Sequence, residues 1–282
     1  MILSGINVVK QTKIYKKMNI TVIGGGNMGL TYAKSIDQKL ESKTISIVDK
    51  DPKKLNNLIK TTNFIVTDTP DEVVENAEVI LLAVKPQIFE IVAKEIRPFL
   101  SQDQLIISIM AGVTIKTITE SLGINKISRA MPNLPAQVNQ GVTGYLNSDT
   151  IDEAEAQKIH SILNATGKAI ILKDENAIDQ ITALSGSGPA YVFYFMNAMI
   201  EKAIEFGFNA DDAKTIVLHT FMGTGTLFES STDSAQVWID RVTSKGGTTH
   251  AALTDFKESN ISKLIQSGVE SAYKRALELG KK

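Results

Sequence analysis

The chain has 282 residues, enough for about two domains with cores of their own. Its 30 lysines and arginines nearly balance 31 aspartates and glutamates, which argues against a nucleic-acid-binding protein, since such proteins usually carry strongly basic surfaces. The lack of cysteine excludes disulfide scaffolds, Cys-ligated zinc and thiol nucleophiles. No apolar run is long enough to span a bilayer, so a membrane is not an expected partner, and the charge balance gives no reason to expect a nucleic acid. A chain without cysteine is compatible with a reducing cytosol, and a cytoplasmic location is expected.

The first 17 residues differ in composition from the rest of the chain. They carry four lysines and no acidic residue. They lack the long apolar core and small-residue cleavage site of a secretory signal, and they lack the arginines of a transit peptide. Because Met18 directly precedes an expected strand, we interpret residues 1–17 as an N-terminal extension or an upstream start, with a targeting segment as the alternative.

Short apolar runs then alternate with segments of helical period. The expected strands are Asn19–Ile23, Thr44–Val48, Phe64–Val66, Val79–Ala83, Leu105–Met110, Lys126–Ala130 and Lys168–Leu172. The expected helices are a segment ending near Leu40, then Pro52–Lys60, Asp71–Glu75, Gln87–Phe99, Ile115–Leu122 and Ile151–Ala165. This alternation is typical of a parallel sheet covered on both faces. It predicts an α/β fold with a Rossmann-like doubly wound sheet over residues 18–173.

A glycine-rich turn follows the first expected strand. Gly24, Gly26 and Gly29 fit the pattern G-x-G-x-x-G between a strand and a helix, and Asp49 follows at the end of the next strand. In dinucleotide-binding turns the first glycine permits the tight turn, the second lets the backbone approach the pyrophosphate, and the third packs the helix on the strand. The free N–H groups of the helix start bind the phosphates. The pattern therefore predicts a dinucleotide site, with a glycine turn that binds no ligand as the alternative.

Two features of the next strand end favour different cofactors. Asp49 would accept a hydrogen bond from a ribose 2′-hydroxyl, which favours NADH. Lys50, Lys53 and Lys54 follow it and would neutralise the 2′-phosphate of NADPH, although lysines at a helix start more often form a solvated face. The choice between NADH and NADPH stays open, with a slight preference for NADH.

The second half of the chain is predicted to be helical. Residues 190–282 contain no proline, and helices are expected at Gly188–Phe206, Ala210–Glu229, Ala235–Thr243, Thr248–Ser259 and Ile261–Leu279. The first of these carries consecutive large apolar residues that point in all directions, so we expect it to be buried all round, either within the domain or partly against another subunit. An all-helical domain over residues 174–282 is therefore predicted.

Glycine and hydroxyl residues stand at two expected helix starts, in the segments 184–189 and 244–249. The free N–H groups of a helix start bind anions, so a substrate carboxylate fits there. Capping of the helices by serine and threonine side chains is the commoner use of such residues and is the favoured interpretation.

The motifs together resemble the pyrroline-5-carboxylate reductase family. The matching segments are VIGGGNMG (22–29), AVKP (83–86), AGV (111–113), RAMPNLPAQVNQG (129–141), LSGSGPAYVF (184–193) and SKGGTTHAAL (244–253). The resemblance covers essentially everything from Met18 onward. It implies a Rossmann domain followed by a helical dimerisation domain that forms an interlocked homodimer, with further assembly into a homodecamer as an open alternative. It also implies active sites where one subunit's Rossmann domain meets the helical dimer.

The reaction implied by the resemblance is the last step of proline biosynthesis. An oxidoreductase acting on a CH–NH group reduces L-1-pyrroline-5-carboxylate to L-proline with NADPH or NADH as cofactor. A hydride attacks the imine carbon and the nitrogen ends up protonated, so catalysis needs orientation of the imine and a hydrogen-bond donor. Neither a strong acid nor a metal is required, and the sequence shows no recognisable metal-ligand cluster.

The resemblance also assigns site residues. Thr249 is the catalytic donor toward the substrate nitrogen. Substrate binding is expected from Ser187, Gly246, Gly247, Thr248, Thr249 and Arg241. Cofactor binding is expected from Gly24, Gly26, Asn27, Met28, Gly29, Asp49, Lys50, Thr69, Ala83, Val84, Lys85, Pro86, Ala111, Gly112, Asn133 and Glu175, of which Thr69 and Glu175 align less closely.

Some positions depart from the family pattern. Lys245 stands where proline is common, Leu134 replaces threonine, and Arg241 stands where glutamine or asparagine is typical. Lys245 either adds charge near the substrate carboxylate or faces solvent. His250 is a candidate general acid, although the family does not require histidine there.

Two other functions compete with the reductase. A hydroxyacid dehydrogenase on the same scaffold is disfavoured by the intact SGSGPA and GGTT segments. A non-enzymatic paralogue is disfavoured because the glycine fingerprint, the AVKP segment and Thr249 are all present.

Overall fold

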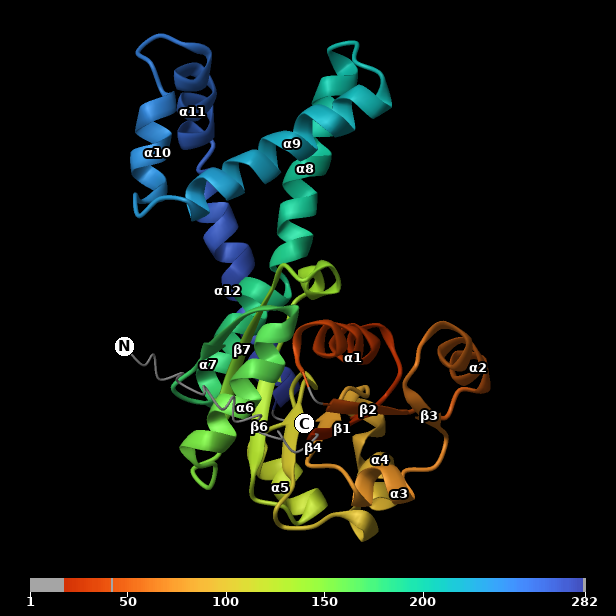
Figure 1. Ribbon diagram of the computed structural model, residues 1–282. Helices are drawn as coiled ribbons and strands as arrows, with labels where there is room; N and C mark the ends of the chain where they lie inside the picture. The colour runs from red at the N-terminus through yellow and green to blue at the C-terminus, as the bar shows by residue number, and fades with distance from the viewer. Residues whose placement is uncertain (1–17, 42, 281–282) are drawn as a thin grey trace, which may run out of the picture.

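The computed structural model describes residues 18–41 and 43–280, so the expected N-terminal extension lies outside the described residues. Figure 1 shows a sheet flanked by helices and, above it, a group of helices that extends away from the sheet. This arrangement confirms the predicted order of a Rossmann-like part followed by a helical part.

The sheet has eight strands in the order β3-β2-β1-β4-β5-β6-β7-β8. They are β1 (Met18–Ile23), β2 (Lys43–Val48), β3 (Ile65–Thr67), β4 (Val79–Leu82), β5 (Leu105–Ser108), β6 (Ile127–Met131), β7 (Gly141–Asn147) and β8 (Gly167–Ile171). β1 pairs in parallel with both β2 and β4, so the order of winding reverses between β1 and β4. Doubly wound sheets bind ligands outside the carboxyl ends of their strands at such a reversal.

Every predicted strand is confirmed, and β7 is an additional strand that the sequence pattern does not predict. This strand runs antiparallel to β6 and parallel to β8, so the prediction of a purely parallel sheet is wrong at this position. Gly144 in the middle of β7 lets a helix approach closely, because a Cβ there would lie 2.6 Å from the Cδ1 of Ile181.

Helices cover both faces of the sheet. They are α1 (Asn27–Lys39), α2 (Pro52–Thr61), α3 (Asp71–Glu75), α4 (Phe89–Ile96), α5 (Ile115–Leu122) and α6 (Glu153–Leu163), with short 3₁₀ turns at Pro86–Ile88, Arg97–Phe99, Leu134–Val138 and Asn164–Thr166. Alternate strand residues enter opposite cores: Leu105 and Ile107 pack with α1, whereas Ile106 packs with α4 and α5. A strand buried on both faces has this pattern, which is why its sequence reads as a continuous apolar run.

The helical part contains α7 (Glu175–Ile181), a π-helical turn (Thr182–Gly186), α8 (Gly188–Glu205), α9 (Ala210–Glu229), α10 (Ala235–Val242), α11 (Thr248–Glu258) and α12 (Ile261–Gly280). All of the helices predicted after residue 188 are confirmed, and α7 was missed. α8 and α9 form a helical hairpin. α12 returns to the sheet, where the carbonyl of Leu279 would lie 3.1 Å from a Cβ at Gly112.

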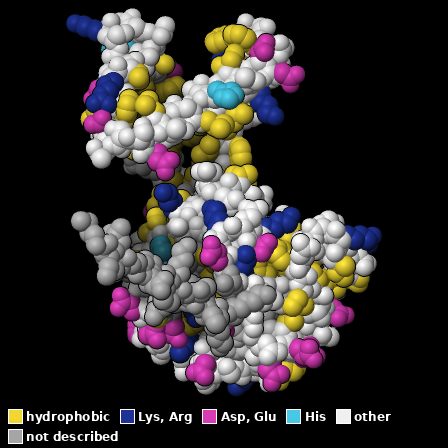
Figure 2. Space-filling model, viewed as in Figure 1, with side chains coloured by type: hydrophobic (Ala, Val, Ile, Leu, Met, Phe, Trp, Pro, Cys, Tyr) yellow, Lys and Arg dark blue, Asp and Glu magenta, His cyan; other side chains and the backbone are white. Residues whose placement is uncertain are grey.

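The prediction that α8 is buried all round is wrong for the single chain. None of its residues is buried, and the side chain of Tyr194 is 76% exposed. Figure 2 shows apolar side chains gathered on the helices above the sheet. Of the two predicted ways to bury α8, packing within its own domain is therefore wrong, and packing against another subunit is the one that stays open. Within the described residues, no helix has both the length and the apolar character needed to cross a bilayer.

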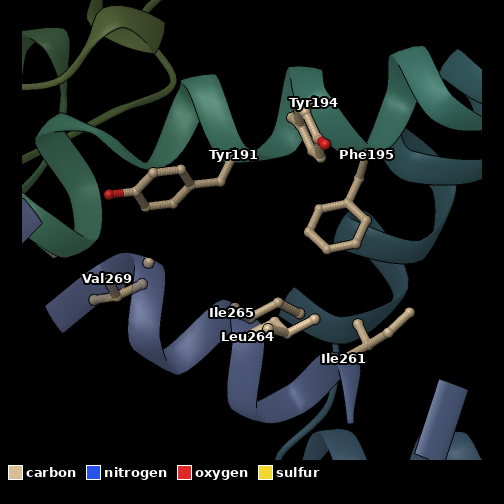
Figure 3. A pocket seen from close by; sticks show the side chains of 8 residues that line it. Tyr191, Tyr194, Phe195, Ile261, Leu264, Ile265 and Val269 are labelled. Atoms are coloured by element: carbon tan, nitrogen blue, oxygen red, sulfur yellow. The ribbon is translucent and has the colours of Figure 1, made fainter. Parts of the chain in front are cut away.

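An apolar cleft of about 410 Å³ lies between α8 and α12. In Figure 3, Phe195 of α8 points across this cleft toward Ile261 of α12, and the ring of Tyr191 lies on the α8 side above Val269. The cleft continues into the exposed apolar side chains of α8 and α12, and such a combination favours an interaction site.

Candidate functional site

The glycine turn joins β1 to α1 at the carboxyl edge of the sheet. Gly24 has a φ of +107°, and a Cβ there would lie 2.7 Å from the carbonyl oxygen of Ala83. A Cβ at Gly29 would overlap the carbonyl of Gly24, so both glycines are required by the fold itself. Gly26 differs, because no atom lies within 4 Å of the position that its Cβ would occupy. The space at Gly26 is therefore free for a ligand.

This contrast gives a matched pair of variants. Gly26→Ala should weaken cofactor binding about tenfold, because its methyl group enters the space that a pyrophosphate would use. Its free energy of unfolding should change by less than about 1 kcal/mol, since the φ of −74° suits alanine. Gly29→Ala should instead lower that free energy by about 1–3 kcal/mol through overpacking. Cofactor titration and thermal unfolding of both variants test this, and equal stability losses would contradict it.

A cavity of about 250 Å³ opens beside the turn, at the carboxyl ends of β1, β2 and β4. Among its lining residues are seven predicted for cofactor binding: Gly24, Gly26, Asp49, Lys50, Ala83, Val84 and Lys85. It is also lined by Lys54, Pro70, Ile88, Val92 and Glu95. Of these, the sequence analysis missed Pro70, Ile88, Val92 and Glu95, which lie outside any recognisable motif.

The Asp49 carboxylate is engaged within the protein. It accepts hydrogen bonds from the backbone N–H groups of Gly25 (2.8 Å) and Asp51 (2.9 Å). The ammonium of Lys54 lies 3.1 Å from the same oxygen that binds Gly25, and the Asp49 side chain is only 10% exposed. Lys50 pairs with Glu95 of α4 at 3.2 Å. Asp49 thus fixes the glycine turn, while Lys50 and Lys54 bring positive charge to the cavity.

The other predicted cofactor residues also follow strands. Asn27 and Met28 begin α1, Thr69 is exposed after β3, Pro86 follows β4, Ala111 and Gly112 follow β5, and Asn133 follows β6. The Asn133 amide donates a hydrogen bond to Ser185 Oγ (2.9 Å) and accepts one from the N–H of Val142 (2.9 Å). All of these segments lie at the carboxyl edge of the sheet, because β1 to β6 are parallel.

Glu175 is the exception among the predicted cofactor residues. It begins α7 rather than following a strand. Like Ala111, Gly112 and Asn133, it does not line the cavity beside the glycine turn. Its carboxylate pairs with Arg129 of β6 and accepts a hydrogen bond from the N–H of Ile115 (2.8 Å).

The Gly246–Thr249 segment forms the start of α11. Gly246 has a φ of +74°, which favours glycine, and Gly247 is the N-cap with no side-chain hydrogen bond to the helix. The prediction that a serine or threonine caps this helix is therefore wrong. The Gly247 N–H donates to the carbonyl of Ser244 (3.0 Å), so the uncapped groups that face outward begin at Thr248 and Thr249.

The segment around Ser187 is not a loop. Residues 182–186 form a π-helical turn that joins α7 to α8, and the N–H of Ser187 donates to the carbonyl of Thr182 (2.9 Å). The predicted helix start is confirmed, since α8 begins at Gly188 with Pro189 in its first turn, but the predicted loop before it is wrong and the N–H of Ser187 is occupied. No side chain caps α8, so the capping interpretation is wrong here too.

Arg241 is held by neighbours on its own helix and the preceding loop. Its guanidinium lies 2.6 Å from Asp233 Oδ2 and 4.7 Å from the centre of the Trp238 ring. The hydrogen bond from Arg241, together with one from Ser231, lowers the pKa of the Asp233 carboxyl. Lys245 and His250 are exposed to solvent beside the start of α11.

One protomer does not bring all predicted site residues together. α12 has 20 residues and is therefore about 30 Å long. One end of it touches Gly112 at the sheet edge, and the other follows α11. Figure 1 shows α10 and α11 at the far end of the helical part from the sheet. Thr249 therefore lies far from the glycine turn of its own chain.

Comparisons with known proteins add to this geometry. Residues 175–279 match the family described as pyrroline-5-carboxylate reductase dimerisation. Residues 19–112 match the family described as NADP oxidoreductase, coenzyme F420-dependent. A pyrroline-5-carboxylate reductase of Staphylococcus haemolyticus is 31% identical over 94% of this chain and 98% of its own. One of Pisum sativum is 30% identical over 91% of this chain and 94% of its own.

Solved structures agree with the sequence relatives. A pyrroline-5-carboxylate reductase of Coxiella burnetii superposes with a TM-score of 0.89 at 33% identity, covering 95% of this chain and all of that one. The pyrroline carboxylate reductase of Plasmodium falciparum with NADP bound gives a TM-score of 0.83 at 27% identity, over 94% of this chain and 99% of its own.

Proposed function

The chain belongs to the pyrroline-5-carboxylate reductase family, and on that basis we propose that it reduces L-1-pyrroline-5-carboxylate to L-proline with a hydride from NADPH or NADH. The observation that carries this proposal is the uncapped start of α11, where Thr248 and Thr249 occupy the first turn in a chain that also has a dinucleotide cavity. An enzyme of this activity completes proline biosynthesis. We propose that it does so in the cytoplasm.

We propose a division of labour between two regions. Residues 18–173 bind the cofactor, and residues 174–282 bind the substrate and the second subunit. The end of the sheet at Ile171 and the start of α7 at Glu175 support a boundary between them. The match of residues 175–279 to a dimerisation family supports the role of the second region.

Each active site is proposed to use two subunits of a homodimer. The cofactor region of one subunit would face the Gly246–Thr249 segment of the other. The separation of these segments within one chain supports this arrangement, as do the exposed apolar faces of α8 and α12. The partner's helices would fill the cleft between α8 and α12. A decamer built from such dimers stays a prediction.

The proposed mechanism depends mainly on orientation. The backbone N–H groups at the start of α11, with the positive end of the helix dipole, would bind the substrate carboxylate. The Thr249 hydroxyl would then donate a hydrogen bond to the ring nitrogen. As the hydride adds to the carbon, the C=N π electrons move to nitrogen, which takes up a proton that comes from solvent. This donor favours attack at the imine carbon, since the hydrogen bond draws electron density toward nitrogen and makes that carbon a better hydride acceptor. Ser187, Gly246 and Arg241 would shape the same pocket.

The residues at the sheet edge fit a nicotinamide dinucleotide, since the open space at Gly26 suits a pyrophosphate. When bound, the cofactor supplies the hydride. Gly24 to Gly29 would hold its phosphates, Asp49, Lys50 and Thr69 would face the adenosine ribose, and Ala83 to Pro86 would lie along the nicotinamide. Ala111 and Gly112 would pass beneath the nicotinamide, with Asn133 beside it.

One assay tests the proposed function directly. The purified protein is mixed with pyrroline-5-carboxylate and either NADH or NADPH, and both cofactor oxidation and proline formation are followed. We expect equal amounts of oxidised cofactor and proline. Lack of turnover with both cofactors, in protein shown to be folded and oligomeric, would overturn the proposal.

The lysines at the cavity give a prediction about cofactor choice. Lys54→Ala should weaken NADPH binding about fivefold to tenfold, because it removes a cation from the 2′-phosphate and frees the charge of Asp49. NADH binding should change less than about twofold, since its ribose carries no phosphate. Lys53→Ala is the matched control, because Lys53 belongs to the same helix but does not line the cavity. Fluorescence titration with both cofactors measures the difference, and an equal loss for both would contradict it.

A further inference from the structure

A buried cation joins the sheet to the helical part. The side chain of Arg129 on β6 is only 2% exposed, and it pairs with two carboxylates of α7, Glu175 and Asp179. Its Nε atom is buried without a hydrogen-bond partner among residues 18–41 and 43–280. Burial of a guanidinium is costly unless it is paired, so the buried position of Arg129 depends on these two carboxylates.

The two carboxylates differ in what else they contact. Glu175 Oε1 accepts a hydrogen bond from the N–H of Ile115 at 2.8 Å. Ile115 is the first residue of α5 and directly follows the loop of residues 109–114, which connects β5 to α5. The Asp179 carboxylate reaches Arg129 at 3.6 Å and makes no side-chain hydrogen bond to this loop within the described part of the chain. Burial raises the pKa of Asp179 and Glu175 adds to the rise, although the Arg129 charge opposes both.

The same loop is also held by α12. Gly112 has a left-handed backbone conformation (φ +74°), and the carbonyl oxygen of Leu279 in α12 packs against it. A Cβ at this position would lie only 3.1 Å from that oxygen, so the absence of a side chain permits the contact. The Tyr273 hydroxyl donates a 2.5 Å hydrogen bond to Asn176 of α7, so α12 and α7 are linked to each other. The loop is therefore fixed between two helices of the dimerisation region, neither of which lines the dinucleotide cavity.

We infer that Glu175 is a positioning residue for the loop of residues 109–114 and not a direct cofactor contact. Through the Ile115 N–H and Arg129, it holds the segment on which the nicotinamide is proposed to rest. This inference rests on the proposed function, because the loop matters to binding only if a nicotinamide cofactor occupies this edge of the sheet. It links the helical region to cofactor affinity by a short chain of contacts from α7 to the loop.

Glu175 and Asp179 provide a matched pair of variants, because each removes one carboxylate from Arg129. Glu175→Ala should raise the dissociation constant for NADPH about tenfold, whereas Asp179→Ala should change it less than about twofold. Both should lower the melting temperature, since both leave Arg129 short of one partner. Glu175→Gln should recover most of the lost affinity, because its amide oxygen still accepts the Ile115 N–H. Equal weakening of NADPH binding by both alanine variants would overturn the inference.

A double-mutant cycle separates positioning from direct contact. Gly112→Ala disturbs the same loop from the α12 side, so its effect on NADPH binding should be less than additive with that of Glu175→Ala. Additive effects would show that Glu175 acts independently of the loop and would overturn the inference. If the wild-type protein binds neither NADPH nor NADH, the proposed function fails. If the wild type binds and Glu175→Ala binds equally well, only the inference fails.

Discussion

Replacing Thr249 with alanine should lower kcat by about 100- to 1000-fold, because this removes the hydroxyl that we propose donates to the substrate nitrogen and stabilises the charge developing on it. The dissociation constants for NADPH and NADH should stay within about twofold, since the proposed partner of the Thr249 hydroxyl is the substrate and not the cofactor. The start of α11 stays intact, because its N-cap is Gly247 and not a threonine side chain. Steady-state kinetics and cofactor titration of the same preparation measure both quantities.

Two further variants show whether the hydroxyl is responsible. Thr249→Ser keeps an oxygen donor on a less restricted side chain and should recover part of the lost turnover. His250→Ala tests the competing general acid on the next residue and should keep kcat within about threefold. A normal kcat for Thr249→Ala would remove Thr249 from the mechanism. A large loss in His250→Ala alone would transfer the role to the histidine.

Mixed dimers of two inactive variants should regain activity that neither variant has alone. Gly26→Asp places a negative charge where the pyrophosphate would bind, yet aspartate is a favourable N-cap for α1, so the variant should fold. Its partner in the mixture carries Thr249→Ala. If each site combines the cofactor region of one subunit with Thr249 of the other, one site in every mixed dimer is intact. Random mixing should then restore about a quarter of wild-type activity.

A control mixture distinguishes shared sites from sites within one chain. The double variant Gly26→Asp/Thr249→Ala is co-refolded with wild type. Shared sites leave no intact site in the mixed dimer and give about a quarter of wild-type activity, whereas sites within one chain give about half. Activity is first measured on each unseparated mixture. Mixed dimers are then isolated with two affinity tags, and with shared sites they should have about half of wild-type activity in the first mixture and none in the control. No recovery in the first mixture, with mixed dimers present, would contradict the shared site.

Much of the fold could be predicted because the strands are buried on both faces. Segments such as Val79–Leu82 are continuous apolar runs, and their helices carry clear turn and cap residues. β7 could not be predicted in this way, since its sequence GVTGYLN includes two glycines and lacks a strong apolar run. Its strand conformation depends on pairing with β6 and β8, and Gly144 is needed for the approach of Ile181. These are long-range contacts that no local pattern encodes.

In the candidate site, too, residues in local sequence motifs could be predicted, whereas residues that depend on long-range contacts could not. The glycine turn and the segment from Ala83 to Pro86 are local motifs, so the sequence identified them and the cavity contains them. Glu95 was missed because it is one of several exposed acids and gains significance only through its pairing with Lys50 across the cavity. The segment before Pro189 was misread as a loop, because glycine and serine suggest a break. In the structure, residues 182–186 form a π-helical turn, and the Tyr191 hydroxyl donates a hydrogen bond to the carbonyl of Ala183 within that turn.

Because α8 exposes aromatic side chains in the single chain, the stability of this protein should depend on its own concentration. A single chain leaves Tyr194, Phe193 and Phe206 in water, and the free energy of covering them becomes available only on association. By mass action, dilution then favours separated and less stable protomers, so the melting temperature should rise with protein concentration. Folding of a newly made chain is therefore completed only when it associates with a second chain. The amount of this protein in a cell then helps to determine how much of it is folded.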